Sequence, residues 1–146
     1  MDDHRARNDA SRDLLRGALT RISDADLTRD TGGGWTVSAG LAHLAYWDRV
    51  TLLRWQKRRR GEPFIGVPEE LTDVLNDAAL PQWRALDPRA AAADMLVAAE
   101  EVDREIAALP ADLVAEANER YPRAIERSLH RQSHLADIER ITGPTR

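Results

Sequence analysis

The chain has 146 residues, of which 42% are hydrophobic, and this size and composition suit one domain that buries a core. It contains no cysteine, which excludes disulfides, thiolate metal sites and a cysteine nucleophile. The formal net charge of −4 and the pI near 5.6 exclude the basic excess of a nucleic-acid binder, so no nucleic-acid partner is expected.

The start of the chain does not have the pattern of an export signal. Residues 1–5 carry acids where a signal peptide has basic residues followed by an apolar run. No apolar stretch approaches membrane-spanning length. We therefore expect a cytoplasmic protein with no membrane partner.

The first third of the chain predicts one amphipathic helix followed by a glycine-rich turn. Residues 9–22 place apolar side chains at helical spacing, with charged residues between them. Residues 30–34 include three consecutive glycines, which predict a flexible turn that serves as a hinge or a close backbone approach. A phosphate-binding loop would need a preceding strand and a following lysine, and both are missing. His4 is expected to be terminal and solvated.

A second helix is predicted from just after Trp35, with Thr36 as its N-cap, to about Arg60. Its buried face is expected to hold Leu41, Leu44, Leu52 and either Trp47 or Trp55. His43 lies on or beside that face, where a lone histidine is more often a core residue than a ligand. The basic run at 57–60 complements the negative end of the helix dipole, which is the ordinary role of cations in a last turn.

The middle of the chain predicts one short and one long helix. A short helix is expected over 68–86, kinked or divided by Pro81. Asp87 is an N-cap followed by a proline, which starts a long helix over 88–109. Residues 110–117 add a helical turn or two.

The last long helix is predicted to run without a break over 122–141. One face holds Ile125, Leu129, Ser133 or His134, Ile138 and Ile141. No segment shows the alternation or the β-branched richness of a strand. We therefore expect one all-α domain over 1–146, a four-helix bundle with short extra helices between its second and third main helices.

The motif with the most chemical content is His130-Arg-Gln-Ser-His134. Two histidines four apart lie on one side of a helix with their Cβ atoms about 6 Å apart, so both can bind one metal ion. His43 is the other histidine in an apolar helical pattern and is the candidate third ligand. Three neutral imidazoles suit Zn²⁺, Ni²⁺ or Fe²⁺, with zinc as the first choice and an open fourth position.

Four further residues are candidates for the surroundings of this site. Asp137, three after His134, and Glu126, four before His130, could orient the imidazole rings, although a solvated surface charge is at least as common in such acid-rich helices. Trp35 and Trp47 could form the walls of a substrate pocket. Aromatic core packing is the favoured alternative for both tryptophans.

Arginines provide candidate partners for an acidic substrate. Arg49, Arg127 and Arg131 could each receive a carboxylate. Arg127 and Arg131 flank His130 on a helix that is expected to be exposed, where the ordinary role is plain surface.

Several segments together resemble a known family. Residues 11–27, the stretch from Gly34-Trp-Thr-Val to Leu41-Ala-His-Leu-Ala-Tyr-Trp47, and the pair His130 and His134 are similar to the DinB/YfiT-like superfamily of metalloenzymes. It includes the N-terminal domain of mycothiol-dependent maleylpyruvate isomerase and the bacillithiol S-transferases. The resemblance implies a four-helix bundle that binds one divalent metal through His43, His130 and His134. Ser38-Ala39-Gly40 departs from the family pattern, because it lacks a capping box and its glycine loosens the first turns by about 1 kcal/mol.

Three functions are compatible with these residues. The favoured one is a metal-dependent enzyme that activates a low-molecular-weight thiol of the mycothiol type for S-transfer to, or isomerisation of, a small-molecule substrate. The alternatives are metal-dependent hydrolysis of a small molecule and a non-catalytic metal-binding or stress-associated bundle. A homodimer is also expected, with Trp55 or Trp83 as interface candidates that could equally belong to the core.

Overall fold

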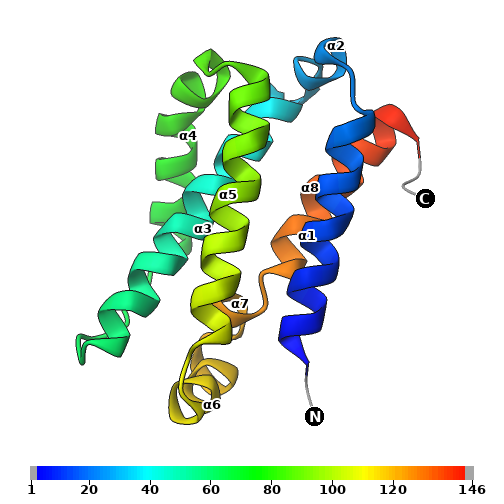
Figure 1. Cartoon of the computed structure of the whole chain (residues 1–146). Helices are drawn as coiled ribbons and strands as arrows, with labels where there is room; N and C mark the ends of the chain where they lie inside the picture. The colour runs from blue at the N-terminus through cyan, green and yellow to red at the C-terminus, as the bar shows by residue number, and fades with distance from the viewer. Residues whose placement is uncertain (1–2, 144–146) are drawn as a thin grey trace.

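The computed structural model describes residues 3–143 and has four main helices that form a bundle (Figure 1). These helices are α1 (His4–Arg21), α3 (Val37–Arg59), α5 (Pro88–Ala107) and α8 (Ser128–Thr142). α1 packs on α8 and α5, and α3 packs on α5 and α8. The prediction of an all-α bundle is confirmed. No helix in residues 3–143 is both long enough and apolar enough to cross a membrane.

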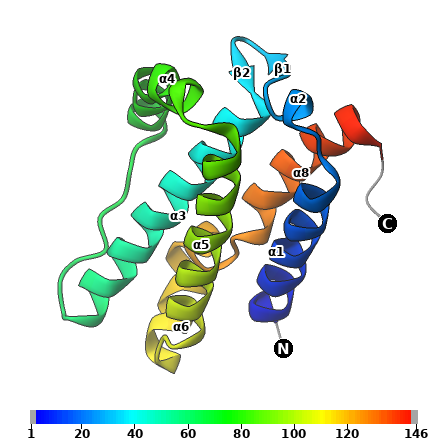
Figure 2. The same ribbon diagram turned by 45° about the horizontal axis from the view of Figure 1, so that its top comes forward.

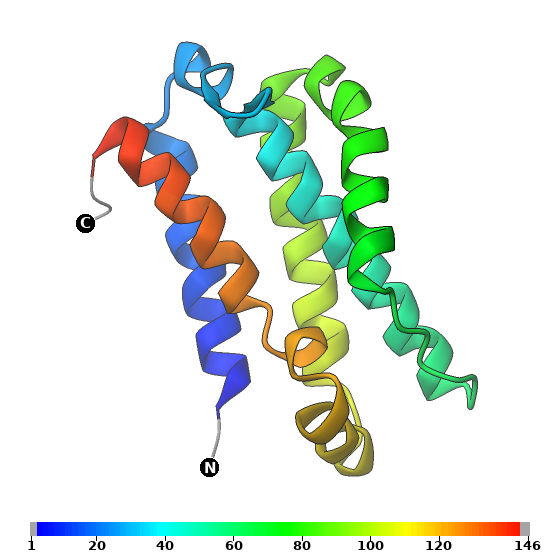
Figure 3. The same ribbon diagram turned by 180° about the vertical axis from the view of Figure 1, so that it is seen from behind.

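Shorter elements connect the main helices. They are α2 (Asp24–Leu27), β1 (Asp30–Gly32), β2 (Trp35–Thr36), α4 (Glu69–Ala85), α6 (Ala111–Arg120) and α7 (Pro122–Ile125). α4 packs against α3 on the outer side of the bundle, as the view from behind shows (Figure 3). With 17 residues, α4 matches the helix that was expected over 68–86. It nevertheless continues through Pro81 without a break, because Pro81 is exposed and water can bind the carbonyl that it leaves unpaired.

Two helix starts follow the local sequence as predicted. The Thr36 side chain accepts a hydrogen bond of 3.1 Å from the Ala39 N–H and caps α3. The Asp87 side chain accepts one of 2.9 Å from the Ala90 N–H and caps α5. Each cap satisfies a backbone donor that the helix itself leaves without a partner.

The glycine-rich segment is a β-hairpin, so the predictions of a flexible hinge and of no strand were wrong. β1 and β2 pair antiparallel above the start of α3 (Figure 2). Gly33 and Gly34 form the two-residue turn with φ of 62° and 85°. Such a turn needs positive φ at both central positions, which glycine adopts without strain.

α1 begins earlier than predicted. The Asp3 side chain accepts a hydrogen bond from the Ala6 N–H, so His4 lies in the first helical turn. His4 is only 7% exposed, which corrects the expectation of a solvated terminal residue. The added turns place Asn8 of α1 against the chain where α8 begins.

The predicted continuous helix over 122–141 is divided at Glu126 and Arg127. The Asn8 Oδ1 atom accepts hydrogen bonds from the backbone N–H groups of Arg127 (2.8 Å) and Ser128 (3.1 Å). A side chain 119 residues away therefore caps α8. The break changes which residues face inward: Leu129 is 54% exposed, contrary to the prediction, and Arg131 is buried in its place.

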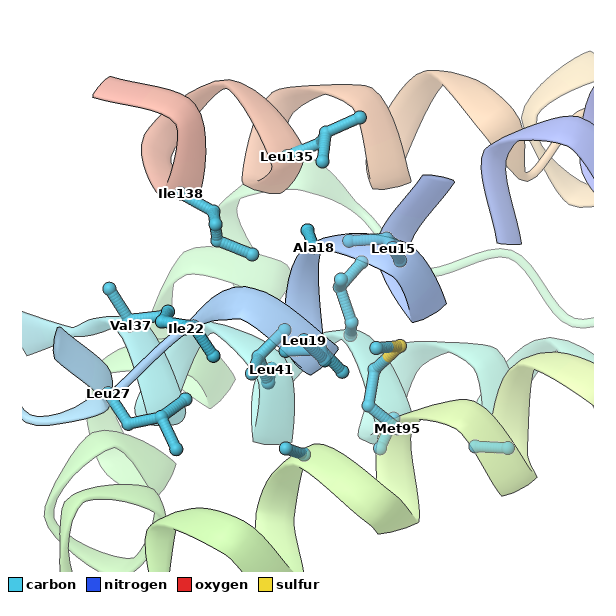
Figure 4. Packing of buried hydrophobic residues seen from close by; sticks show 14 residues of the cluster. Leu15, Ala18, Leu19, Ile22, Leu27, Val37, Leu41, Met95, Leu135 and Ile138 are labelled. Atoms are coloured by element: carbon cyan, nitrogen blue, oxygen red, sulfur yellow. The ribbon is translucent and has the colours of Figure 1, made fainter. Parts of the chain in front are cut away.

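Three apolar clusters occupy the described part of the chain, and the smallest, around Trp83, also includes Ala39, Ala42 and Ala91. Figure 4 shows the largest one, whose labelled members come from α1 and the residue after it, α2, α3, α5 and α8: Leu15, Ala18, Leu19, Ile22, Leu27, Val37, Leu41, Met95, Leu135 and Ile138. The second surrounds Trp55, whose indole N–H donates to the Ala124 carbonyl at 2.8 Å. Trp55 and Trp83 are both buried, so neither provides the exposed interface considered for a homodimer, which stays a prediction.

Candidate metal centre

Three histidines from two helices meet beside the core. α3 carries His43, and α8 carries His130 and His134 one turn apart. One nitrogen from each ring lies within 4.8 Å of the others, and the Nε2 atoms of His43 and His130 are 2.9 Å apart. The tertiary structure thus brings together the three residues that the sequence singled out.

The spacing of the nitrogens fits a bound ion. Two imidazole nitrogens that each lie about 2.0–2.1 Å from one metal are roughly 3.0–3.4 Å apart. When the nitrogens of two neutral imidazoles lie this close, either one proton forms a hydrogen bond between them or both nitrogens bind one metal ion. The Nδ1 atom of His43 is buried and has no hydrogen-bond partner within residues 3–143. The cluster can therefore hold a divalent metal once its three nitrogens, which lie within 4.8 Å of one another, move closer together.

The surroundings keep all three rings neutral. Burial, and then the charge of His134, lower the pKa of His43 to about 4. Burial lowers the pKa of His134 to about 4, and burial together with His134 and Arg127 lowers that of His130 to about 2. At neutral pH each ring therefore has a free lone pair, which is the form that binds metal.

These pKa shifts predict an acid-sensitive metal-free protein. Between pH 6.5 and pH 4 the unfolded chain binds protons at these histidines and the folded chain does not, so stability falls as the pH falls. We expect the urea midpoint of the metal-free protein to decrease through this window. A variant with glutamine at positions 43, 130 and 134 should lose that part of the pH dependence, and an equal slope in both proteins would contradict the assignment.

Gly40 lets α3 and α8 approach each other at the site. A Cβ atom at this position would lie 2.9 Å from Nδ1 and 3.3 Å from Cε1 of His134. The glycine at position 40 therefore makes room for a candidate ligand. The low helix propensity of glycine is the cost of leaving this space for the His134 ring.

We expect Gly40→Ala to weaken metal binding at least about tenfold and to lower the melting temperature. The added methyl group must displace the His134 ring, and such overpacking costs about 1–3 kcal/mol, more than the gain in helix propensity. Gly17→Ala is the matched control, because its new Cβ meets nothing within 4 Å in helix α1. Isothermal titration with Zn²⁺ and thermal unfolding of both variants test this. A stabilised Gly40→Ala protein with unchanged zinc affinity would refute it.

Two cavities adjoin the histidine cluster. The smaller, about 260 Å³, lies towards the start of α3 and is mostly apolar, with Trp35, Val37, Leu41, His134 and Ile138 among its lining residues. The larger, about 520 Å³, extends along α3 and α8 and includes Trp47, Thr51, Arg54, Arg127 and His130. His43 and Asn76 line both cavities. The cluster is therefore accessible from two sides.

A comparison with known protein families matches residues 7–138 to the DinB superfamily. The chain belongs to the DinB superfamily. Comparisons with curated proteins and with solved structures found no match. Membership of this superfamily and the three-histidine cluster together fit a metal-binding protein.

In this DinB-superfamily chain, one predicted pocket tryptophan contacts the cluster and the other lines the cavity beside it. Trp35 packs edge-to-face on the His43 ring, with centroids 5.4 Å apart, and lines the smaller cavity. Trp47 lines the larger cavity, and its indole N–H donates to the Asn76 side-chain oxygen at 2.8 Å. Contact of either tryptophan with a substrate stays a prediction.

The two carboxylates predicted to orient the rings have other partners. Asp137 lines the smaller cavity and forms an ion pair with Arg140 at 2.5 Å. Glu126 forms an ion pair with Arg7 at 2.6 Å and accepts a hydrogen bond from the Ser128 hydroxyl. The break between α7 and α8 also removes the helical spacing that would have placed Glu126 one turn below His130.

Arg131 was predicted either to receive a substrate carboxylate or to be plain surface, and both predictions are wrong. Arg131 is 1% exposed, and its guanidinium binds the Asp103 carboxylate through two hydrogen bonds of 2.8 and 2.9 Å. It also contacts Asp48 at 3.4 Å, and Arg127 binds the other Asp48 oxygen at 2.8 Å. This buried network joins α8 to α3 and α5 directly beside His130.

The sequence contained a signal for this network. Arg127 and Arg131 continue the inward stripe of Leu135 and Ile138 at helical spacing, so charges occupy core positions. Buried charges of that kind need partners on facing helices. We considered these arginines only as surface or substrate contacts, because the unbroken helix gave a different inward face.

Two residues of α4 at the site were not predicted. Trp83 is buried with its ring centroid 5.3 Å from that of His43, and Asn76 lies between the two cavities. The amphipathic pattern of α4 predicts a helix, but the sequence of this segment does not determine which other helix it packs on. Trp83 was considered only for the dimer interface or the core.

Proposed function

We propose that this protein is a metal-dependent enzyme that uses a low-molecular-weight thiol for S-transfer to, or isomerisation of, a second small molecule. The observation that carries this proposal is the pair of unlike cavities that meet at His43. A reaction with two organic substrates needs two such spaces next to one reactive centre. Because the chain has no cysteine, the thiol must come from a cosubstrate.

The three imidazoles fit a divalent transition metal, with zinc as the first choice and nickel or iron as alternatives. Such an ion lowers the pKa of a thiol, so that the thiolate is available at neutral pH. The residues of the chain bind and orient the reactants: the apolar lining near Trp35 suits the electrophile, and the polar lining near Trp47 suits the thiol. Trp35 and Trp83 each pack edge-to-face on His43 and also pack on each other, which holds the His43 ring in place.

The transfer step balances without an external oxidant or reductant. The thiol sulfur forms a bond to an electrophilic carbon, and the leaving group departs from that carbon with its bonding electrons. The thiol proton passes to solvent or to the leaving group. In an isomerisation the sulfur instead adds to a carbon–carbon double bond and is expelled after rotation, so the thiol is regenerated.

The test is turnover by zinc-loaded protein with 1-chloro-2,4-dinitrobenzene as electrophile and mycothiol, glutathione or cysteine as thiol. We expect thioether formation at least about 100-fold faster than with His130→Ala, since a bound metal supplies several kcal/mol of activation. Equal loss of the electrophile without any thiol would show hydrolysis instead. Full metal occupancy with no turnover across a panel of electrophiles and thiols would make the protein a non-catalytic metal-binding bundle.

A further inference from the structure

The larger cavity runs along one stripe of α3 away from the histidine cluster. His43, Trp47, Thr51 and Arg54 are spaced by four, four and three residues, so they lie on one side of the helix and all line this cavity. Their α-carbons extend over roughly 16 Å, at 1.5 Å per residue. A ligand whose reactive end lies at His43 can therefore reach Arg54 with its far end.

Arg54 lacks the acidic partner that comparable arginines have. Within residues 3–143, every other arginine that is not fully exposed forms an ion pair with a carboxylate: Arg12, Arg16, Arg49, Arg58, Arg127 and Arg131. Arg54 is half-buried, its Nε is buried without a hydrogen-bond partner, and no carboxylate of the described chain pairs with it. Its desolvated charge is thus left for a ligand.

The guanidinium of Arg54 is held in place before any ligand arrives. Its central carbon lies 4.0 Å from the centroid of the Phe64 ring, and Phe64 in turn packs on Trp55 and Tyr121. Stacking of this kind fixes the plane of the guanidinium and leaves its edge available for hydrogen bonds. A preorganised donor loses little side-chain entropy when it binds an anion.

Two other arginines that line the larger cavity make it electropositive. Arg123 is exposed and has no ion pair within residues 3–143, and Arg127 shares Asp48 with Arg131. Glu126 also lines the cavity, but Arg7 neutralises its carboxylate. Burial and the nearby charge of Arg127 lower the pKa of Arg54, which is the effect expected of like charges without a counterion.

We propose that Arg54 and Arg123 form an oxyanion subsite for a carboxylate or phosphate group of the ligand whose other end reaches the histidine cluster. This assignment deepens the proposed function, on which it rests for the identity of the reactive end. It names the substrate class: one of the two reactants carries an acidic group at the end remote from the reacting atom. Arg54 provides the fixed, stacked donor and Arg123 the exposed one.

The test is isothermal titration of metal-free protein with malonate, with inorganic phosphate and with neutral malonamide. We expect malonate or phosphate to bind one site with a Kd on the order of 1 mM and malonamide not to bind. Arg54→Gln should weaken anion binding at least about tenfold, and Arg54→Lys should weaken it less, because the charge remains while the planar fork is lost. The tighter of the two anions identifies a carboxylate or a phosphate ligand.

Lys57→Gln is the matched control, because Lys57 is an exposed cation one turn further along α3 and does not line the cavity. It should leave the Kd within about twofold. The proposal is overturned if neither anion binds, if Arg54→Gln binds as tightly as the parent, or if binding needs zinc and ignores Arg54. Since the titration uses metal-free protein, a failure of thiol chemistry would leave a positive result intact. Zinc content, measured in the same variants, should be unchanged.

Discussion

Replacing His130 by alanine is expected to abolish stable metal binding. Its Nε2 lies 2.9 Å from that of His43, so loss of this ring removes one of three converging donors. Loss of a partner outside the coordination sphere already weakens metal affinity by about 10–100-fold, so loss of a ligand should cost more than about 100-fold. Elemental analysis of protein purified without an affinity tag should find near one equivalent of a single transition metal in the parent and almost none in the variant.

The same loss is expected for His43→Ala and His134→Ala. The remaining histidine, His4, is the control, because it is buried but lies outside the cluster. His4→Gln should keep its metal. Saturating zinc should raise the melting temperature of the parent and of His4→Gln, but not that of the three alanine variants. At a zinc concentration of 100 times the Kd, the expected gain in the free energy of unfolding is about 2.7 kcal/mol. A parent that stays metal-free after incubation with zinc, nickel and iron would rule out the site and the enzyme proposal with it.

Arg131→Met should destabilise the protein by about 3–5 kcal/mol, a large part of a typical total of about 5–15 kcal/mol. The methionine fills a similar volume but leaves Asp103 and Asp48 with less compensation for their buried charges. Removing the arginine is expensive because each buried carboxylate then keeps a single ion pair, Asp103 with Arg12 and Asp48 with Arg127. Urea unfolding measures this directly, and a change below about 1 kcal/mol would show that the network contributes little.

Two further variants separate charge burial from other effects. Arg140→Met on the same helix removes an exposed pair with Asp137 and should cost less than about 1 kcal/mol. Arg131→Met combined with Asp103→Leu should be more stable than Arg131→Met alone, because positions 131 and 103 are then both apolar and Arg12, which also binds Asp103, keeps its ion pair with Asp9. A double variant that is less stable than the single one would indicate that packing, not charge, dominates at this position.

Local chemistry explains which predictions were confirmed. The caps Thr36 and Asp87 act on donors three residues ahead, so the starts of α3 and α5 follow from the sequence around them. The start of α8 has no such local cap, since its partner is Asn8 on α1. Hydropathy over 122–141 therefore predicted one helix where the folded chain has two, and it misassigned Leu129 to the interior.

The sequence by itself determined that the chain is all-α, and it selected His43, His130 and His134. Helical periodicity, caps and a four-residue spacing act within one or two turns, so they are present before the chain folds. Only the tertiary structure decided that His43 meets the pair on α8, that Gly40 makes room for His134, and that Arg131 turns inward to Asp103. Each of these depends on contacts between helices distant in the chain, where packing and the desolvation of charge, rather than local preference, determine the arrangement.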